Sequence, residues 1–378
     1  MTPIRSNAIV IGAGFIGSSI AVHLRWRGLS VRLLERDRIG DGTSSRGGGW
    51  VTAQSRQPNS HLALALASLN YWPDFLERLG DDCGYIRCGS LVLFQSEQQL
   101  QQRRLFLAEQ KKVPGYDGVE FLDGTQVRDL EPQIAEHIVG GSYRKGDGQV
   151  DPARLIRGIV TAARRDGVDV HQGGHVTAIE PDGAGWRVRT PIGEFAADFV
   201  VNAAGVWSPE VASLVGMKLQ VQPIAGQMCT TAPRPPFVTR VVAVQIDTRR
   251  TNRPACDVRQ GYDGRIWLGT TNRPDSRDTT VTEADTRTIR TGVARVFPAL
   301  EDVVIEHAWA GIRPVPTDLL PIYGGAEDKP GLYVAVPLAG ICETAIAGKA
   351  MAELITTGTS GTPLDAVSPR RFTAPVAA

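Results

Sequence analysis

The chain has 378 residues, and 41 Lys and Arg against 40 Asp and Glu give it a net charge of +1. Its 42% hydrophobic and 21% charged residues are typical of globular proteins and exclude a disordered, collagen-like or coiled-coil chain. Nucleic-acid binders usually carry a concentrated basic surface, so this balance predicts no nucleic-acid partner. Glycine exceeds its usual share of about 7%, with 41 of the 378 residues.

The first 35 residues predict a strand, a turn, a helix and a second strand. Residues 8–11 form a continuous apolar run, as expected of a parallel strand that is buried on both faces. A helical pattern follows and ends at Gly28, a typical C-terminal stop signal. Residues 30–35 read as the next strand. Together these segments predict a βαβ unit.

The rest of the chain alternates between α/β and β-rich segments. Asp151 and Pro152 suit the N-cap and the first residue of a helix that we expect to end near residue 165. The other expected elements are a loop over 40–49, helices over 61–79, 97–112, 283–297 and 341–357, strands within 90–94, 168–180, 185–190, 195–204 and 332–336, short strands over 219–304, and a weakly ordered tail after 358.

This alternation predicts a discontinuous domain organisation. We expect a Rossmann-type cofactor domain of the α/β class, interrupted by two insertions that together form an α+β substrate domain with an antiparallel sheet. The cofactor domain is assigned to residues 1–80, 145–218 and 305–378, and the substrate domain to residues 81–144 and 219–304.

Several common features are not expected. No apolar run reaches the roughly 18 residues needed to cross a bilayer, and the first apolar stretch is too short for a signal peptide. Five cysteines, an odd number in a chain of this size, predict free thiols in a reducing cytoplasm. The Cys83/Cys88 and His171/His175 pairs do not match zinc-ligand patterns, so no metal site is predicted.

The turn after the first strand carries a dinucleotide-binding fingerprint. Gly12, Gly14 and Gly17 form G-x-G-x-x-G, and the acidic Glu35 ends the next strand. The helix N-terminus would bind phosphates, and Glu35 would accept hydrogen bonds from ribose hydroxyls while repelling a 2′-phosphate. This context disfavours both a glycine-rich turn without a ligand and NADP as the ligand, but it does not separate FAD from NAD.

Three further segments are suited to close approach by a cofactor. Residues 42–50 contain three adjacent glycines followed by Trp50, although such a run is also found in flexible loops. Residues 199–208 form an apolar strand that ends in small residues, where ligands of α/β sheets bind. Residues 310–314 contain Arg313, and residues 338–342 open a helix whose N-terminus suits negative charge.

Taken in order, these segments resemble the D-amino-acid oxidase family of FAD-dependent oxidoreductases. The similarity is greatest to the glycine oxidase and sarcosine oxidase branch, which includes catalytic subunits of the hydrogen cyanide synthase and opine oxidase type. It extends from about residue 9 to residue 354 and is also carried by residues 151–155, 176–179, 201–207, 223–227, 263–271 and 311–314. It implies FAD as cofactor and a first domain of the glutathione-reductase type.

The resemblance also implies which residues hold FAD. Those near the ADP half are Gly12, Ala13, Gly14, Phe15, Ile16, Gly17, Glu35 and Arg36, with Val176 at the adenine. Those that would line the pyrophosphate and the isoalloxazine ring are Thr43, Ser44, Gly48 and Gly49, and those along the cofactor are Ala204, Gly205 and Trp207. Those at the pyrimidine end of the flavin are Gly340, Ile341, Cys342 and Glu343, and Gly311 and Arg313 are further expected cofactor contacts.

Three residues are candidates for contact with the substrate. Arg313 matches the family arginine that binds a substrate carboxylate, and a guanidinium suits that task, although a structural ion pair is the alternative. Trp50 would wall the flavin or the substrate, with a core tryptophan as the alternative. Asp257 stands in the segment where glycine oxidases tend to have a tyrosine, and it would attract a cation if it points inward.

Cys342 has two interpretations. It could be a covalent anchor for the flavin, but the covalent sarcosine oxidases place their cysteine elsewhere in the chain. A small buried hydrophobic side chain is the simpler interpretation.

The predicted function is FAD-dependent oxidation of an amino acid or secondary amine that carries a carboxylate. Arg313 would orient the substrate so that its Cα hydride passes to flavin N5 and an imine forms. The electron acceptor would be oxygen or, as the alternative, a partner of a dye-linked amino-acid or opine dehydrogenase. An oxidase of a cyclic or peptide-tethered biosynthetic amine and a non-catalytic flavin subunit are further alternatives, and homo- and hetero-oligomers both remain open.

Overall fold

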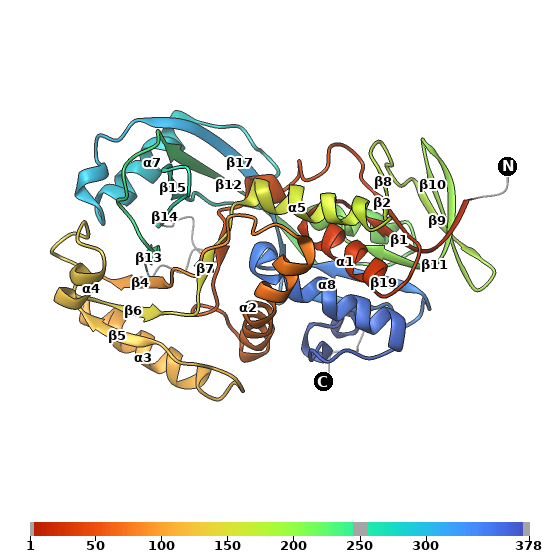
Figure 1. The fold of residues 1–378 in the computed structure, drawn as a ribbon, viewed down its shortest axis with the longest axis horizontal. Coiled ribbons are helices and arrows are strands. Elements are labelled where there is room, and N and C mark those ends of the chain that lie inside the picture. Colours follow the sequence, from red (N-terminus) through yellow and green to blue (C-terminus); the bar gives the residue numbers. More distant parts are fainter. Residues whose placement is uncertain (1–3, 245–255, 373–378) are drawn as a thin grey trace.

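The computed structural model describes residues 4–244 and 256–372 (Figure 1). Residues 245–255 of the predicted substrate domain and the end of the predicted tail, residues 373–378, lie outside the described residues. The described part of the tail contains two short 3-10 helices, Asp365–Val367 and Pro369–Phe372. Arg371 in the second of them donates to Asp318 at 2.6 Å, so the expectation of weak order is wrong for this part.

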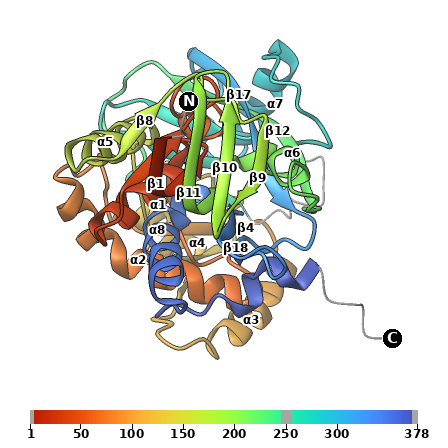
Figure 2. The same ribbon diagram turned by 90° about the vertical axis from the view of Figure 1, so that its right-hand side faces the viewer.

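The first sheet contains eight strands, and Figure 2 shows β8, β1, β11, β10 and β9 next to one another. Its central order is β18-β19-β11-β1-β2-β8, and β10 and β9 extend it beside β11. The pairs among β19, β11, β1, β2 and β8 are parallel. The bounds are β1 Ile4–Ile11, β2 Val31–Leu34, β8 Asp169–His171, β9 Ala178–Asp182, β10 Gly185–Thr190, β11 Gly193–Asn202, β18 Ile322–Gly325 and β19 Leu332–Val336.

Strand β1 is buried on both faces, as its apolar sequence predicts. Ala8 and Val10 pack in the core under the helices, and Ile9 and Ile11 pack in a second core on the opposite face. The helices on the first face are α1 Phe15–Trp26, α2 Asn59–Leu79, α5 Pro152–Arg165 and α8 Gly340–Thr357. The N-cap prediction for α5 is confirmed, because the Asp151 carboxylate accepts a hydrogen bond from the Arg154 N–H at 2.7 Å.

The second sheet contains nine strands and occupies the left of Figure 1. Its order is β16-β12-β15-β14-β13-β4-β6-β5, with β17 also paired to β12. The bounds are β4 Ser90–Phe94, β5 Glu120–Asp123, β6 Gly140–Arg144, β12 Val221–Thr231, β13 Val241–Val244, β14 Asp257–Gln260, β15 Ile266–Gly269, β16 Arg273–Pro274 and β17 Ile305–Pro316. Near it lie α3 Glu97–Gln110, α4 Gly124–Leu130 and α7 Glu283–Ala294.

This sheet differs in one respect from the predicted antiparallel arrangement. Strands β13 and β4, which come from two separate stretches of the chain, pair in parallel, so the sheet is mixed. Strand β17 belongs to this sheet, although its residues fall in a range that the prediction assigned to the cofactor domain. The predicted domain boundaries themselves stay a prediction.

The remaining elements are short. They are β3 Trp50–Val51, β7 Gly148–Gln149, α6 Ser208–Ser213, and 3-10 helices at Ser44–Arg46, Gly205–Trp207 and Pro298–Leu300. Strands β3 and β7 pair with each other, which fixes the start of the loop that follows Trp50. Within residues 4–244 and 256–372, no helix is both long and apolar enough to cross a bilayer.

Candidate active site

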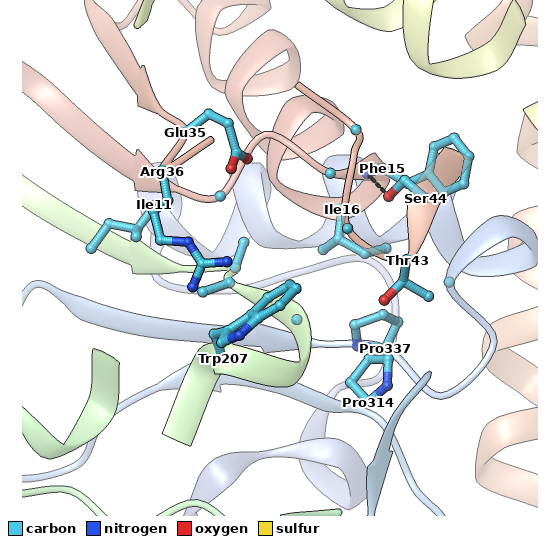
Figure 3. A pocket seen from close by; sticks show the side chains of 18 of the residues that line it. Ile11, Phe15, Ile16, Glu35, Arg36, Thr43, Ser44, Trp207, Pro314 and Pro337 are labelled. Atoms are coloured by element: carbon cyan, nitrogen blue, oxygen red, sulfur yellow. Dashed lines mark hydrogen bonds between the residues drawn. The ribbon is translucent and has the colours of Figure 1, made fainter. Parts of the chain in front are cut away.

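A cavity of about 1110 Å³ opens at the carboxyl ends of β1, β2, β11 and β19. Residues that follow these strands line it, and β17 contributes Arg313 and Pro314 from the second sheet. Figure 3 shows Pro314 beside Pro337, which follows β19. Ligands of α/β sheets bind at this edge, so the cavity lies where the sequence places the cofactor.

The glycines of the fingerprint make the turn at one end of this cavity. Gly12 has φ +102°, and a Cβ on it would lie 2.6 Å from the Ala203 carbonyl oxygen. A Cβ on Gly17 would lie 1.9 Å from the carbonyl oxygen of Gly12. Helix α1 begins after Gly14 without a side-chain cap, and Ser44 accepts a hydrogen bond from the Phe15 N–H at 3.0 Å (Figure 3). Only glycine fits both contacts, and the exposed helix N-terminus suits a phosphate.

Glu35 is held rigidly beside this turn. Its carboxylate accepts hydrogen bonds from the N–H of Ala13 at 2.9 Å and of Asp37 at 3.0 Å. The guanidinium of Arg36 lies over the ring of Trp207, 4.5 Å from its centroid (Figure 3). An acidic residue at the end of the second strand is suited to accept hydrogen bonds from ribose hydroxyls. The Arg36 guanidinium and the Trp207 ring lie at the same end of the cavity.

The second sheet contributes Arg313 and Pro314 of β17 to the cavity wall, and strand pairing relates Arg313 to Asp257. Asp257 is paired with Gly269, Gly269 with Met228, and Met228 with Trp309, which forms one row across four strands. Directly paired residues point to the same face, and residues four apart in a strand share a face. Arg313 therefore lies on the same face of the sheet as Asp257, although Asp257 does not itself line the cavity, and its predicted contact with a cation stays a prediction.

The electrostatics agree with this placement. Burial raises the pKa of Asp257 to about 6, while the nearby charges of Arg313 and Arg56 act to lower it. The described residues thus place one carboxylate within reach of two guanidinium charges. Such a strongly shifted pKa next to charged partners is frequent at functional sites.

Arg313 is oriented by a residue that the sequence did not single out. Its Nη2 donates a hydrogen bond to the side-chain oxygen of Asn272, which is only 5% exposed. The Asn272 amide nitrogen is buried and has no hydrogen-bond partner among the described residues. Asn272 lies just beyond the 263–271 segment, in a loop where no spacing or motif marks it.

Trp50 lines the cavity, so the alternative of a core tryptophan is not supported. A Cβ on Gly48 would lie 2.1 Å from its ring, which explains the glycine at that position. The indole N–H of Trp50 is buried and has no hydrogen-bond partner in the part of the chain that the structure describes. Trp50 therefore contributes to the cavity wall, and its contact with flavin or substrate stays a prediction.

Most of the other predicted cofactor residues line the same cavity. They are Gly12, Gly14, Phe15, Ile16, Glu35, Arg36, Thr43, Ser44, Gly48, Val176, Ala204, Gly205, Trp207, Gly340, Ile341 and Cys342. The structure brings them together from widely separated parts of the chain. Their individual contacts with FAD stay predictions.

Six predicted site residues do not line the cavity: Ala13, Gly17, Gly49, Asp257, Gly311 and Glu343. Ala13 and Gly17 shape the turn behind it, and Gly49 and Gly311 leave room for Arg259 and Arg46. The five residues other than Asp257 support the cavity wall from outside, whereas Asp257 lies on the same sheet face as Arg313.

Glu343 is the clearest case of a supporting position. Its buried carboxylate accepts hydrogen bonds from Tyr323 at 2.6 Å and from the Ala339 N–H at 2.7 Å, and it pairs with His61 at 2.9 Å. Burial acts to raise the pKa of Glu343, but these partners hold it below its usual value. The carboxylate thus fixes the turn before α8 from behind.

The environment of Cys342 favours the interpretation as a small buried side chain. The residue is 1% exposed, and burial raises the pKa of its thiol to about 11. A thiol of this kind stays protonated near neutral pH and is a poor nucleophile for covalent attachment. All five cysteines are free, as predicted.

The Rossmann-type sheet, the glycine turn with Glu35 and the arginine-bearing sheet over the cavity define a dinucleotide-dependent enzyme. Residues 7–354 match the family described as FAD dependent oxidoreductase, and the chain belongs to that family. This family is FAD dependent, and the cavity fits the cofactor: the fingerprint glycines let a ligand approach where a Cβ would collide with backbone, beside a helix N-terminus whose N-cap residue, Gly14, has no side chain to cap it.

The relatives agree with this assignment. The chain is 28% identical to glycine oxidase of Geobacillus kaustophilus over 93% of both chains. It is 26% identical to an opine oxidase subunit of Rhizobium meliloti over 97% of both. The crystal structure of the Geobacillus glycine oxidase superposes with a TM-score of 0.89 at 27% identity, covering 97% of this chain and 98% of the other.

These findings confirm the predicted family, the fold class and FAD as cofactor. They also confirm the predicted enzyme class, an FAD-dependent oxidoreductase for amines or amino acids.

Proposed function

We propose that this enzyme oxidises a small amino acid or secondary amine at the carbon next to its carboxylate, with Arg313 binding that carboxylate. The main support for this proposal is that Arg313 lies in the cavity wall and donates a hydrogen bond to Asn272. The similarity to glycine oxidase and to an opine oxidase subunit supports this substrate class. Asp257, on the same face of the sheet, would receive the substrate amine.

In this arrangement the chain's residues act by positioning. Arg313 holds the carboxylate bidentately, and Asp257 draws the amine toward the second sheet, so the Cα–H bond has one preferred direction. Trp50 excludes water from one side of the site. FAD, when bound, supplies the oxidising chemistry by accepting the hydride.

A second candidate is a dehydrogenase subunit that passes electrons to a partner instead of oxygen. The similarity to the Rhizobium opine oxidase subunit over 97% of both chains favours it. Rapid anaerobic bleaching of the flavin followed by slow reoxidation in air would identify this candidate. Fast reoxidation in air would instead identify an oxidase.

We further propose a cytoplasmic enzyme that forms a homo- or hetero-oligomer, which its five free cysteines and the subunit nature of one relative support. We keep the division into a cofactor domain and a substrate domain, given above, as part of this proposal.

The test is an anaerobic titration of the yellow holoenzyme with D- and L-amino acids, N-methyl amino acids and opines. We expect flavin bleaching by at least one of these compounds. In Arg313→Ala, KM should rise about 30-fold or more while FAD stays bound, because loss of a hydrogen-bonded charge pair costs about 2 kcal/mol or more. Arg313→Lys keeps the positive charge but lacks the planar guanidinium. Its KM should lie between that of the wild-type enzyme and that of Arg313→Ala. Unchanged KM in Arg313→Ala would contradict the carboxylate role.

A further inference from the structure

A second arginine, Arg56, lines the same cavity as Arg313 but belongs to no motif of the sequence. It comes from the loop between β3 and α2, just after Trp50. The function proposed above gives it no task. Its position therefore needs a separate explanation.

The backbone and one edge of Arg56 are fixed in place. Its Nε donates to the carbonyl oxygen of Thr52 at 3.0 Å, and the thiol of Cys342 lies 3.5 Å from the same oxygen. Its backbone N–H donates to the carbonyl oxygen of Ala53 at 2.9 Å, and its own carbonyl oxygen accepts from the Gln110 amide at 2.9 Å. The guanidinium is thus anchored beside the start of α8, at the end of the cavity that holds Trp50.

The terminal nitrogens of Arg56 differ from those of three other arginines in the cavity wall, while Arg38, whose side chain also lacks a partner among the described residues, is exposed. Each of three other lining arginines has a lining carboxylate as its partner: Arg36 with Asp37 at 2.8 Å, Arg46 with Asp41 at 3.6 Å, and Arg277 with Glu210 at 2.5 Å. Among the described residues, no hydrogen bond or ion pair engages the terminal nitrogens of Arg56. A half-buried guanidinium in this state is well suited to a ligand carboxylate or phosphate.

The charge balance around the proposed substrate points the same way. The charges of both Arg313 and Arg56 reach Asp257. A simple zwitterionic amino acid would use Arg313 for its carboxylate and Asp257 for its amine. A substrate bound in this way has no negative group left to pair with the guanidinium of Arg56.

We propose that Arg56 binds a second carboxylate of the substrate, so that the preferred substrate is an amino acid or secondary amine with two carboxylates. This inference rests on the proposed function. It makes Arg56 the specificity-determining residue, while Arg313 and Asp257 hold the reacting end. The second guanidinium discriminates because a monocarboxylate bound to Arg313 leaves both terminal nitrogens of Arg56 without a partner.

The experiment compares monocarboxylates (glycine, sarcosine) with dicarboxylates (aspartate, glutamate, iminodiacetate) on the holoenzyme at fixed ionic strength. We expect a higher kcat/KM for at least one dicarboxylate. Arg56→Gln should lower that kcat/KM about 30-fold or more, as removal of one partner of a charge pair does, and should change the monocarboxylate values less than about threefold.

Arg38→Gln is the matched control, because Arg38 lines the same cavity but is exposed at the Glu35 end. Arg38→Gln should leave the ratio of kcat/KM between dicarboxylates and monocarboxylates unchanged. This comparison distinguishes a specific binding role of Arg56 from a general effect of removing one positive charge. Equal losses for both substrate classes in Arg56→Gln, or the same loss in Arg38→Gln, would overturn the inference.

A binding measurement keeps this inference separate from the proposed function. Malonate and acetate are titrated against the holoenzyme, and the flavin absorbance reports their dissociation constants. Malonate should bind more tightly than acetate in the wild-type enzyme and lose this advantage in Arg56→Gln. If no amine bleaches the flavin but malonate behaves this way, the proposed function fails and the anion site stands. A shifted flavin reduction potential in Arg56→Gln with no loss of malonate affinity would overturn the site and assign Arg56 to the cofactor.

Discussion

At the scale of single residues, the reacting end of the site depends on a few buried polar contacts. Asn272 holds Arg313 through its side-chain oxygen and, among the described residues, keeps a buried amide nitrogen without a partner. A buried polar atom without a partner in a native site indicates a ligand or an ordered water. We therefore regard Asn272 as a positioning residue that acts through Arg313.

Asn272→Ala should raise KM about tenfold with little change in kcat, because a hydrogen bond to a charged group contributes about 1.5 kcal/mol or more. Asn272→Asp keeps the acceptor but adds a carboxylate that competes with the substrate for Arg313. It should raise KM further than Asn272→Ala does. Steady-state kinetics with FAD content measured in parallel test this order, and a smaller effect of the Asp variant would contradict the positioning role.

Asp257 should impose an acidic limb on the pH profile. Burial raises its pKa to about 6, so the carboxylate becomes charged, and able to attract an ammonium group, as the pH rises through that value. We expect kcat/KM to increase through pH 6 in the wild-type enzyme. In Asp257→Asn this limb should disappear, and a limb that persists unchanged would assign the titration to another group.

The same pKa has a consequence for stability whose sign is opposite to that of an ion-paired carboxylate. The folded state binds the proton more tightly than the unfolded chain, whose Asp has a pKa of 3.8. The contribution of Asp257 to the free energy of unfolding is therefore largest below about pH 4 and decreases as the pH rises to about 6. A shift of about two units corresponds to at most about 3 kcal/mol. Asp257→Asn should raise the unfolding free energy at pH 8 but not at pH 4, as measured by urea unfolding.

At the scale of elements, the turn between β1 and α1 determines whether the cofactor is held. Gly12 and Gly28 flank this helix, and both have positive φ, at +102° and +92°. A Cβ on Gly12 would collide with the carbonyl oxygen of Ala203, whereas a Cβ on Gly28 would meet nothing within 4 Å. A side chain at Gly28 would cause backbone strain alone, whereas a side chain at Gly12 would cause backbone strain and a steric collision at the cofactor site.

Gly12→Ala should abolish FAD binding, because the turn must move away from the end of β11. Gly28→Ala should cost about 1 kcal/mol through its positive φ and keep FAD. The ratio of flavin to protein absorbance and the thermal midpoint of each variant provide the measurement. Equal flavin content in the two variants would show that the turn does not form the cradle.

At the scale of the whole molecule, the cavity is shared by the two sheets. The ends of β1, β2 and β11 form one wall, and Arg313 and Pro314 of β17 contribute to the other. A ligand that contacts both walls binds only when both sheets are folded and correctly placed. It therefore stabilises the whole folded molecule.

FAD added to the apoprotein should therefore raise the thermal midpoint as one cooperative shift, equivalent to about 4 kcal/mol at a thousandfold excess over Kd. FMN, which lacks the adenosine half, cannot reach Glu35 and the Arg36–Trp207 pair and should give a smaller shift. Scanning calorimetry of the apoprotein with either flavin tests this. Equal shifts from FMN and FAD would contradict the placement of the adenosine at that end.

Prediction from the sequence succeeded where the signal is local. The buried β1, the fingerprint turn, Glu35 and the cap of α5 follow from spacing and residue type within a few tens of residues, and the structure reproduces them. The identity of the cofactor required the ordered series of motifs. Asn272 and Arg56 escaped because neither lies in a motif, and their significance depends on residues that are distant in the chain.

The sequence by itself determined that a dinucleotide turn lies between the first strand and the first helix, because this feature is encoded by contiguous residues, and it led to the prediction that Arg313 binds a carboxylate. Tertiary structure alone decided which face of β14 carries Asp257, that Glu343 supports α8 from behind, and that Arg56 joins Arg313 in one cavity. The physical reason is that strand register and loop packing bring these groups together, and both depend on contacts between residues far apart in the sequence.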